Sequence, residues 1–301
     1  MQKKKLNKDE IKILVCCHKK AELPNDPDGI LLPIQVGAAI SDIDLDMQHD
    51  DKINNKKCDN ISNKNQSYCE LTALYWSWKN IEKIYPNIKY IGLFHYRRFM
   101  NFKSKTLFPK EYRSISDIEK YNISIKDIEE KLTDNVILLP KQDNLIFPPK
   151  IQYCINHYSD DFYKLDNIIK NNYNEYYHCF DYFFNKTNKI NFYNMAIMPI
   201  EIFKDYCEWL FSILTKLENE TNIENYSPVQ KRLYGYIAER LLNVYCLYMK
   251  YKNKTILKYF PVTYFSEEKK SNNLYRYIIT RIKSFLILFI IKPKFHKRIK
   301  G

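Results

Sequence analysis

Side chains that can bind an anion or exchange a proton follow one another at His95, Tyr96, Arg97 and Arg98. The run before them, YIGLF at 90–94, is apolar on both alternating faces, which predicts a strand buried on both sides of a mainly parallel sheet. Ligands of open α/β sheets bind outside the carboxyl ends of such strands. Because arginine donates paired hydrogen bonds to phosphate and keeps its charge, the sequence predicts an anionic ligand at this place.

The two arginines also have a structural interpretation, in which they bridge the sheet and a helix. If the strand continued through Arg97 and Arg98, their side chains would point to opposite faces. Either the chain turns here, or only one of the two guanidinium groups reaches the ligand.

The segment before this strand predicts a helix. Its apolar residues recur at i, i+3, i+4 and i+7, as Leu71, Leu74, Tyr75 and Trp78. Ser67 and Glu70 have the S-x-x-E spacing of a capping box, which predicts that the helix begins there and that Glu70 caps it.

Two long stretches, CELTALYWSWKN at 69–80 and GLFHYRRF at 92–99, resemble the signature of bacterial capsular and exopolysaccharide-synthesis glycosyltransferases, a family long catalogued as a domain of unknown function. Further similar stretches are IQVGAA at 34–39, NISNKN at 60–65, FYNMAIM at 192–198, YCEWLF at 206–211 and QKRLYGYIAERLLNVY at 230–245. The resemblance covers about residues 11–265. It implies an α/β, GT-A-like, Rossmann-related fold with a mostly parallel sheet flanked by helices. It also implies sugar transfer from a nucleotide-diphosphate donor to a glycan acceptor.

Inverting transfer requires a carboxylate that takes the proton of the acceptor hydroxyl. Glu239 and Glu70 lie inside the similar stretches. We expect Glu239 to be the catalytic base, because the capping box accounts for Glu70, and inverting GT-A enzymes commonly place the base on a helix at this side of the sheet. The alternative for Glu239 is an ion pair with Arg240 or Arg232.

Enzymes with a GT-A fold often hold a divalent ion with a D-x-D motif where a strand like 90–95 ends. This chain has HYRR there, so we expect Arg97 and Arg98 to stabilise the leaving diphosphate, with no metal and no cofactor besides the nucleotide sugar. A D-x-D metal motif could be assigned to the alternating aspartates Asp42, Asp44 and Asp46. No apolar strand leads into them, so we expect an exposed acidic segment there. A metal-dependent transferase using these aspartates is the alternative.

Other candidate donor-binding residues lie around these elements. His18 follows a predicted first strand and either contacts the nucleotide or is a solvated loop histidine. Asn194 begins the 192–198 segment, and Arg232 lies near Glu239. Around the predicted first helix the candidates, some aided by the helix N-terminus, are Asp59, Asn60, Lys64, Glu70, Thr72 and Trp76. Trp76 is equally explained as a core residue.

The remaining chain predicts a polar leader at 1–10, one domain at 11–265 and a basic tail at 266–301. Strands are predicted at 11–16, 135–140 and 192–198, and helices at 151–169, 173–185, 199–217 and 227–250. Residues 22–33 predict a loop, and residues 100–130 predict a polar surface insertion.

Composition limits the function classes. The net charge of +13 favours phosphorylated ligands, polyanions or anionic lipid. The 8 cysteines show no CxxC spacing, which is typical of free thiols in a reducing compartment. No glycine-rich phosphate loop, secretory signal or nucleic-acid-binding motif is present, so we expect no nucleic-acid partner.

The tail at 275–300 places basic residues around the apolar run SFLILFII, which is shorter than the roughly 20 residues of a membrane span. This pattern predicts a helix lying on the anionic inner face of the cytoplasmic membrane, and hence a lipid-linked acceptor. The alternative is a helix packed on the domain. A non-catalytic membrane-associated scaffold also remains open, as does the choice between a hexopyranose and a galactofuranose donor.

Overall fold

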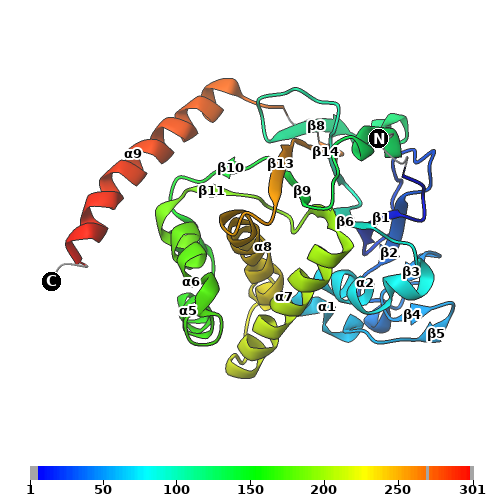
Figure 1. Ribbon diagram of the computed structural model, residues 1–301, viewed down its shortest axis with the longest axis horizontal. Helices are drawn as coiled ribbons and strands as arrows, with labels where there is room; N and C mark the ends of the chain where they lie inside the picture. Colours follow the sequence, from blue (N-terminus) through cyan, green and yellow to red (C-terminus); the bar gives the residue numbers. More distant parts are fainter. Residues whose placement is uncertain (1–5, 269–270, 299–301) are drawn as a thin grey trace.

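The computed structural model describes residues 6–268 and 271–298, apart from the side chains of Arg276 and of residues 288–298. Within those residues ten strands form one mixed, mostly parallel sheet (Figure 1). They are β1 (Ile11–Cys17), β2 (Leu31–Gln35), β3 (Gln48–His49), β6 (Tyr90–His95), β7 (Arg98–Met100), β8 (Lys110–Ser114), β9 (Val136–Pro140), β12 (Ala196–Pro199), β13 (Ile256–Phe260) and β14 (Val262–Ser266). Two short antiparallel pairs are β4 (Lys52–Ile53) with β5 (Lys56–Lys57), and β10 (Asp143–Asn144) with β11 (Lys189–Ile190).

The sheet has the order β13-β9-β12-β6-β1-β2-β3, with β7, β8 and β14 beside this path. β1 lies between β2 and β6 and runs parallel to both. β12 is antiparallel to β6 and β9, and therefore joins two parallel groups. The helices are α1 (Asn65–Tyr68), α2 (Leu71–Ile84), α3 (Ile125–Glu129), α4 (Pro149–Asn156), α5 (Ser159–Asn172), α6 (Asn174–Asp181), α7 (Ile200–Glu220), α8 (Leu233–Tyr251) and α9 (Leu274–Arg298). The predicted α/β architecture is confirmed.

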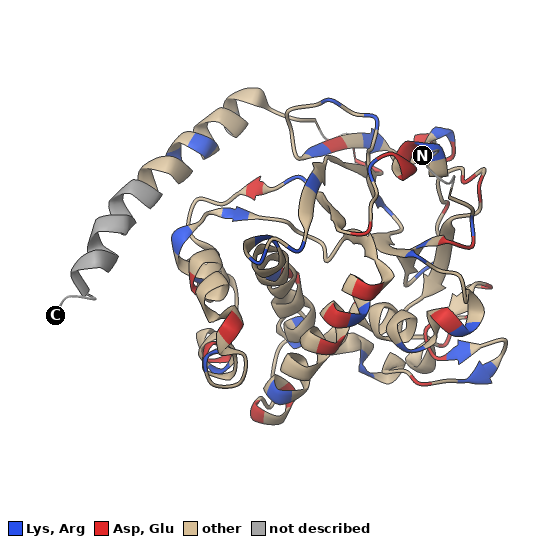
Figure 2. Ribbon diagram, in the orientation of Figure 1, with Lys and Arg blue, Asp and Glu red and all other residues tan. Residues whose placement is uncertain are grey.

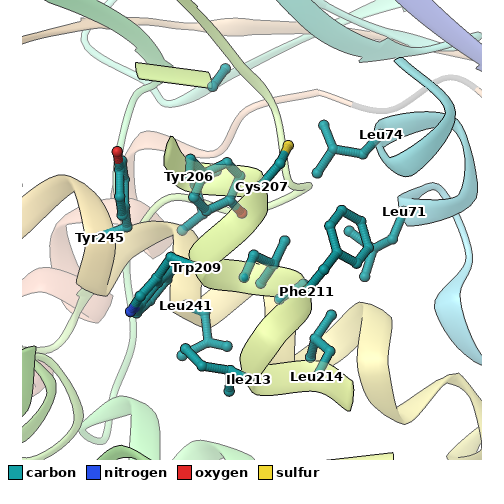
Figure 3. Close-up of a cluster of buried hydrophobic side chains, with 14 of the residues drawn as sticks. Leu71, Leu74, Tyr206, Cys207, Trp209, Phe211, Ile213, Leu214, Leu241 and Tyr245 are labelled. Carbon is teal, nitrogen blue, oxygen red and sulfur yellow. The ribbon is translucent and has the colours of Figure 1, made fainter. Parts of the chain in front are cut away.

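The two faces of the central strands belong to two different cores, because successive side chains of a strand point to opposite faces. Leu93 packs into a core that includes residues of α2, α7 and α8, whereas Phe94 packs into a core on the other face. The helical core is rich in aromatic rings, and Trp209 and Tyr245 pack 5.5 Å apart within it (Figure 3). Trp209 is 6% exposed and belongs to this core.

The prediction of a surface insertion at 100–130 is wrong. Ile118, Ile123, Ile125 and Ile128 of this segment are buried and cover the face opposite the helices. β8 also lies in this segment and pairs with β14. Because polar residues lie between these isoleucines, the sequence pattern did not indicate that the segment covers a face of the sheet.

Several predicted boundaries also differ from the structure. β2 begins at Leu31, inside the predicted loop at 22–33. The strand predicted over 192–198 is regular only from Ala196, because Tyr193 and Asn194 have positive φ. The helix predicted from residue 227 begins as a 3-10 turn, and α8 itself begins at Leu233.

α9 begins beside the body of the protein and then runs apart from the other helices (Figure 1). Its inner side is attached through Asn188, which donates a hydrogen bond to Ser284, and through the ring of Phe108, which lies 5.2 Å from that of Tyr277. Its outer side exposes Ile282 and Phe285, at 53% and 70%. None of the helices in the described residues is long and apolar enough to cross a membrane.

Close packing in the sheet centre generates the first testable prediction, for Gly92→Ala. A Cβ at Gly92 would lie 2.7 Å from Ile197 Cγ1 and 3.1 Å from the Ala196 carbonyl oxygen of β12. We expect this overpacking to lower the free energy of unfolding by about 1–3 kcal/mol, measured by urea titration.

The matched control is Ile197→Ala, alone and combined with Gly92→Ala. The added methyl group would enter the space that Ile197→Ala creates, so the double variant should lose less stability than the sum of the single variants. Strictly additive losses would contradict the contact.

Candidate functional site

A cavity with a volume of about 770 Å³ opens where β1 and β6 end at the sheet edge. The ends of these strands contribute Cys16, His18, His95, Tyr96, Arg97 and Arg98 to its lining. More of the lining comes from the α1–α2 junction, the segment before β12, the residues around the start of α8, and β14. These residues are Cys69, Glu70, Tyr193, Lys231, Arg232, Gly235, Tyr236, Glu239 and Tyr264. The cavity therefore has guanidinium groups, two carboxylates and several aromatic rings on its walls.

A tight turn after β6 determines where the side chains of Arg97 and Arg98 lie. His95 pairs with Arg98 across this turn, so Tyr96 and Arg97 occupy its tip and β7 runs back antiparallel to β6. Both arginines consequently line the cavity. This is the first of the two arrangements that the sequence allowed, in which the chain turns.

Arg98 is the more constrained of the two arginines. Its guanidinium carbon lies 4.7 Å from the centre of the Tyr193 ring and 5.1 Å from that of Tyr264, so the group is held between two aromatic faces. Its Nε is buried and has no hydrogen-bond partner among the described residues. Arg97 differs, because its Nη2 donates to Glu267 Oε1 at 2.7 Å.

Two histidines stand at the strand ends. His95 Nε2 lies 2.7 Å from the Tyr193 carbonyl oxygen, and since that oxygen only accepts, Nε2 carries the hydrogen. Burial lowers the pKa of His95, which favours the neutral ring. His18 packs edge-on against Tyr96 at 5.2 Å, and the partial burial of its ring, together with neighbouring cations, lowers its pKa.

The capping box predicted at Ser67–Glu70 is wrong. Cys69 adopts φ 52 and ψ −130 between α1 and α2, and it interrupts the helix that the spacing predicted to begin at Ser67. Such a backbone conformation is uncommon for residues other than glycine and concentrates at functional sites. Glu70 makes no cap hydrogen bond, and its Oε1 instead accepts from Asn194 Nδ2 at 2.7 Å.

The first turns of α8 lie close to this junction. An added Cβ at Gly235 would meet Cys69 Sγ at 3.2 Å, so glycine permits the close approach. Arg232 Nε donates to the same sulfur at 3.2 Å. Arg232 therefore reaches the cavity beside Cys69.

Glu239 projects from α8 into the same cavity, and its side chain is 18% exposed. Its Oε1 accepts from the Tyr193 backbone N–H at 2.6 Å, and its Oε2 lies 3.6 Å from Arg240 Nη1. Burial raises the pKa of this carboxyl, while Arg240 acts in the opposite direction. The ion pair considered from the sequence is thus present with Arg240, whereas Arg232 faces Cys69.

The structure does not bring five of the predicted donor-binding residues to the cavity. Trp76 is a fully buried core residue whose Nε1 donates to the Lys52 carbonyl oxygen. The other four bond locally or to a distant helix: Asp59 to Tyr75, Asn60 to Cys58, Lys64 to Glu218 and Thr72 to Cys69. Asn194 lies directly behind the lining and bonds to Glu70 and the Gly235 carbonyl oxygen.

The acidic segment 41–47 contains no strand, and its three aspartates are exposed or partly exposed away from the cavity lining. Asp44 Oδ1 lies 3.0 Å from His49 Nε2, and hydrogen bonds lower the pKa of Asp44. Across the parts of the chain with described side chains, no group of three or more His, Cys, Asp or Glu is placed to hold a metal ion.

Sequence reasoning missed the two rings that hold Arg98. Tyr193 lies inside the FYNMAIM stretch, and this similarity was the available signal, but the prediction named only the neighbouring Asn194. Tyr264 lies in β14, close to the end of the predicted domain, and nothing in its local sequence indicated proximity to Arg98. Lys231 and Gly235 lie in the long stretch at 230–245 without any spacing that marks them.

Comparison with known proteins gives matches of two kinds, to a solved structure and to a family model. A solved structure described as the apo form of the bifunctional glycosyltransferase WbbM superposes with a TM-score of 0.74 at 32% sequence identity, over 88% of this chain and 47% of that chain. The chain therefore spans about half the length of that protein, and its α/β sheet is consistent with a GT-A-like fold. No curated protein matches the sequence. Since a family model matches residues 12–252, the chain belongs to the family described as Domain of unknown function (DUF4422).

Proposed function

We propose that this protein is a glycosyltransferase that moves a sugar from a nucleotide-diphosphate donor to a glycan acceptor. The observation that carries the proposal is Arg98, a permanently charged group in the lining of the cavity, held between two rings and with a buried Nε that has no hydrogen-bond partner among the described residues. A diphosphate supplies the acceptor oxygens that this nitrogen lacks. The likeness to WbbM, described as a bifunctional glycosyltransferase, supports the same class of reaction.

In the proposed mechanism the donor diphosphate lies against Arg98, with Arg97, Lys231 and Arg232 on the surrounding walls. These cations stabilise the negative charge that grows on the leaving diphosphate as the sugar–oxygen bond breaks. A carboxylate of the cavity takes the proton of the acceptor hydroxyl, and attack from the opposite side of the sugar inverts its configuration. Glu239 was the carboxylate expected from the sequence.

The biological setting is also a proposal. The acceptor would be a lipid-linked glycan of capsule or exopolysaccharide synthesis, and α9 would hold the enzyme at the inner face of the cytoplasmic membrane. The exposed apolar residues of α9, together with Arg281 and Lys283, fit a surface of anionic lipid. Basic and acidic residues are interspersed over the elements of the body, whereas the described part of α9 has basic residues and no acidic residue (Figure 2).

The central test is binding of nucleoside diphosphates by Arg98→Ala. We expect the best ligand among UDP, dTDP and GDP to bind about tenfold or more weakly, because a hydrogen bond to a charged group is lost. Isothermal titration calorimetry measures the change, and release of nucleoside diphosphate from a panel of nucleotide sugars measures turnover.

Arg97→Ala should weaken binding less, because Glu267 already engages Arg97. Arg113→Ala is the matched control, since Arg113 is exposed on β8 and lies over the Tyr121 ring away from the cavity. Unchanged affinity in Arg98→Ala would contradict the proposed diphosphate site.

Metal removal tests the proposed role of the cations. We expect nucleoside diphosphate release to continue in excess EDTA, because fixed guanidinium and ammonium groups supply the positive charge at the leaving group. Asp44→Asn should also retain activity. Loss of activity in EDTA with recovery in manganese would instead favour the metal-dependent alternative based on Asp42, Asp44 and Asp46.

Membrane association is tested with Ile282→Glu and Phe285→Glu in α9. We expect both variants to lose sedimentation with vesicles of phosphatidylglycerol and phosphatidylcholine, because each places a negative charge on the exposed apolar side. Binding of the unaltered protein should also weaken at high salt. Ile43→Glu is the control, as Ile43 is 67% exposed in the acidic loop. Equal sedimentation of all variants would exclude α9 as the contact.

A further inference from the structure

The turn before β12 is an unusual piece of backbone at the cavity wall. Tyr193 has φ 82 and Asn194 has φ 52, so two successive residues other than glycine occupy the left-handed region. Such a conformation persists only where surrounding contacts determine it. The Tyr193 ring at this turn is one of the two that hold Arg98.

Three elements clamp this turn from different directions. Glu239 on α8 accepts the Tyr193 N–H at 2.6 Å, and His95 at the end of β6 donates to the Tyr193 carbonyl oxygen at 2.7 Å. Asn194 Nδ2 donates to Glu70 Oε1 at 2.7 Å and to the Gly235 carbonyl oxygen at 3.2 Å. Because both partners of that amide are acceptors, its orientation is fixed.

The two cavity carboxylates are therefore engaged unequally. Glu239 Oε1 accepts the Tyr193 N–H, and Glu239 Oε2 forms an ion pair with Arg240 Nη1 at 3.6 Å, while that nitrogen donates its hydrogen bond to the Tyr236 carbonyl oxygen. Glu70 receives the Asn194 amide at Oε1, and its Oε2 has no hydrogen-bond partner among the described residues. Glu70 also stands at the N-terminus of α2, where the helix dipole favours a negative charge.

We propose that Glu70 is the catalytic base of the transfer and that Glu239 is a positioning residue that holds the Tyr193–Asn194 turn. This assignment rests on the proposed function. Glu70 Oε2 takes the proton of the acceptor hydroxyl while the acceptor oxygen bonds to the anomeric carbon. The bond from that carbon to the diphosphate breaks, and its electron pair leaves with the nucleoside diphosphate. Protonated Glu70 then returns its proton to water.

Glu239 acts on the reaction through Arg98. By accepting the Tyr193 N–H it keeps the Tyr193 ring against the guanidinium, and so fixes the group that binds the diphosphate. Its removal should therefore impair donor binding, whereas the removal of Glu70 should impair the chemical step.

Isosteric variants separate the two roles. In both Glu70→Gln and Glu239→Gln, a carbonyl oxygen still accepts the original hydrogen bond, but a basic carboxylate is lost. We expect Glu70→Gln to lower kcat for nucleoside diphosphate release about 100-fold or more with unchanged UDP affinity. Glu239→Gln should keep kcat within about tenfold, a loss smaller than removal of a general base produces. Glu239→Ala, which cannot accept the Tyr193 N–H, should raise KM and weaken UDP binding.

Glu208→Gln, on the exposed side of α7, is the control for loss of a carboxylate elsewhere. The assignment is overturned if Glu239→Gln loses kcat as severely as Glu70→Gln, or if Glu70→Gln stays active. If the unaltered protein binds no nucleoside diphosphate and hydrolyses no nucleotide sugar, the proposed function fails together with the assignment. An active unaltered protein with the reverse ranking of variants overturns the assignment alone.

Discussion

A partly buried guanidinium keeps its charge, and this constraint organises the cavity around Arg98. The side chain cannot lose its proton to escape burial, so its surroundings must stabilise a cation. The rings of Tyr193 and Tyr264 stabilise the cation through their aromatic faces. The Tyr193 ring reaches the guanidinium because the backbone at Tyr193 adopts the left-handed region. That turn in turn requires acceptors and donors from α2, β6 and α8. One charged group therefore links four segments that are distant in the sequence.

The layers of the fold place these segments. β6 lies between a helical core and a second core covered by residues 115–128, so its end has little freedom to move. β14 pairs with β7, and this pairing brings Tyr264 next to Arg98. The cavity is thus enclosed by regular structure, and its walls include few long loops. Precise placement of charged groups relies on such rigid support.

The sequence predicted the parts of this arrangement that depend on local periodicity. β1, β6, β9 and α7 follow from apolar runs or helical spacing, and Arg97 and Arg98 were recognised as anion-binding candidates at a strand end. Local sequence patterns did not predict contacts between residues that are distant in the sequence. Glu70 has the spacing of a helix cap, but the amide of Asn194, 124 positions away, and the turn at Cys69 give it another role. The isoleucines at 115–128 follow no single period, so their burial was equally concealed.

The cavity lining also contains two cysteine thiols, those of Cys16 and Cys69. Burial raises the pKa of Cys69 to about 11, with Glu70 acting in the same direction, and burial also raises the pKa of Cys16, another residue of the lining. Because the thiolate is the reactive form, both sulfurs are protonated at neutral pH and react slowly with peroxides and alkylating agents. The surroundings that hold the carboxylates and the cations in place thus also keep two sulfur atoms of the cavity lining in their less reactive, protonated form.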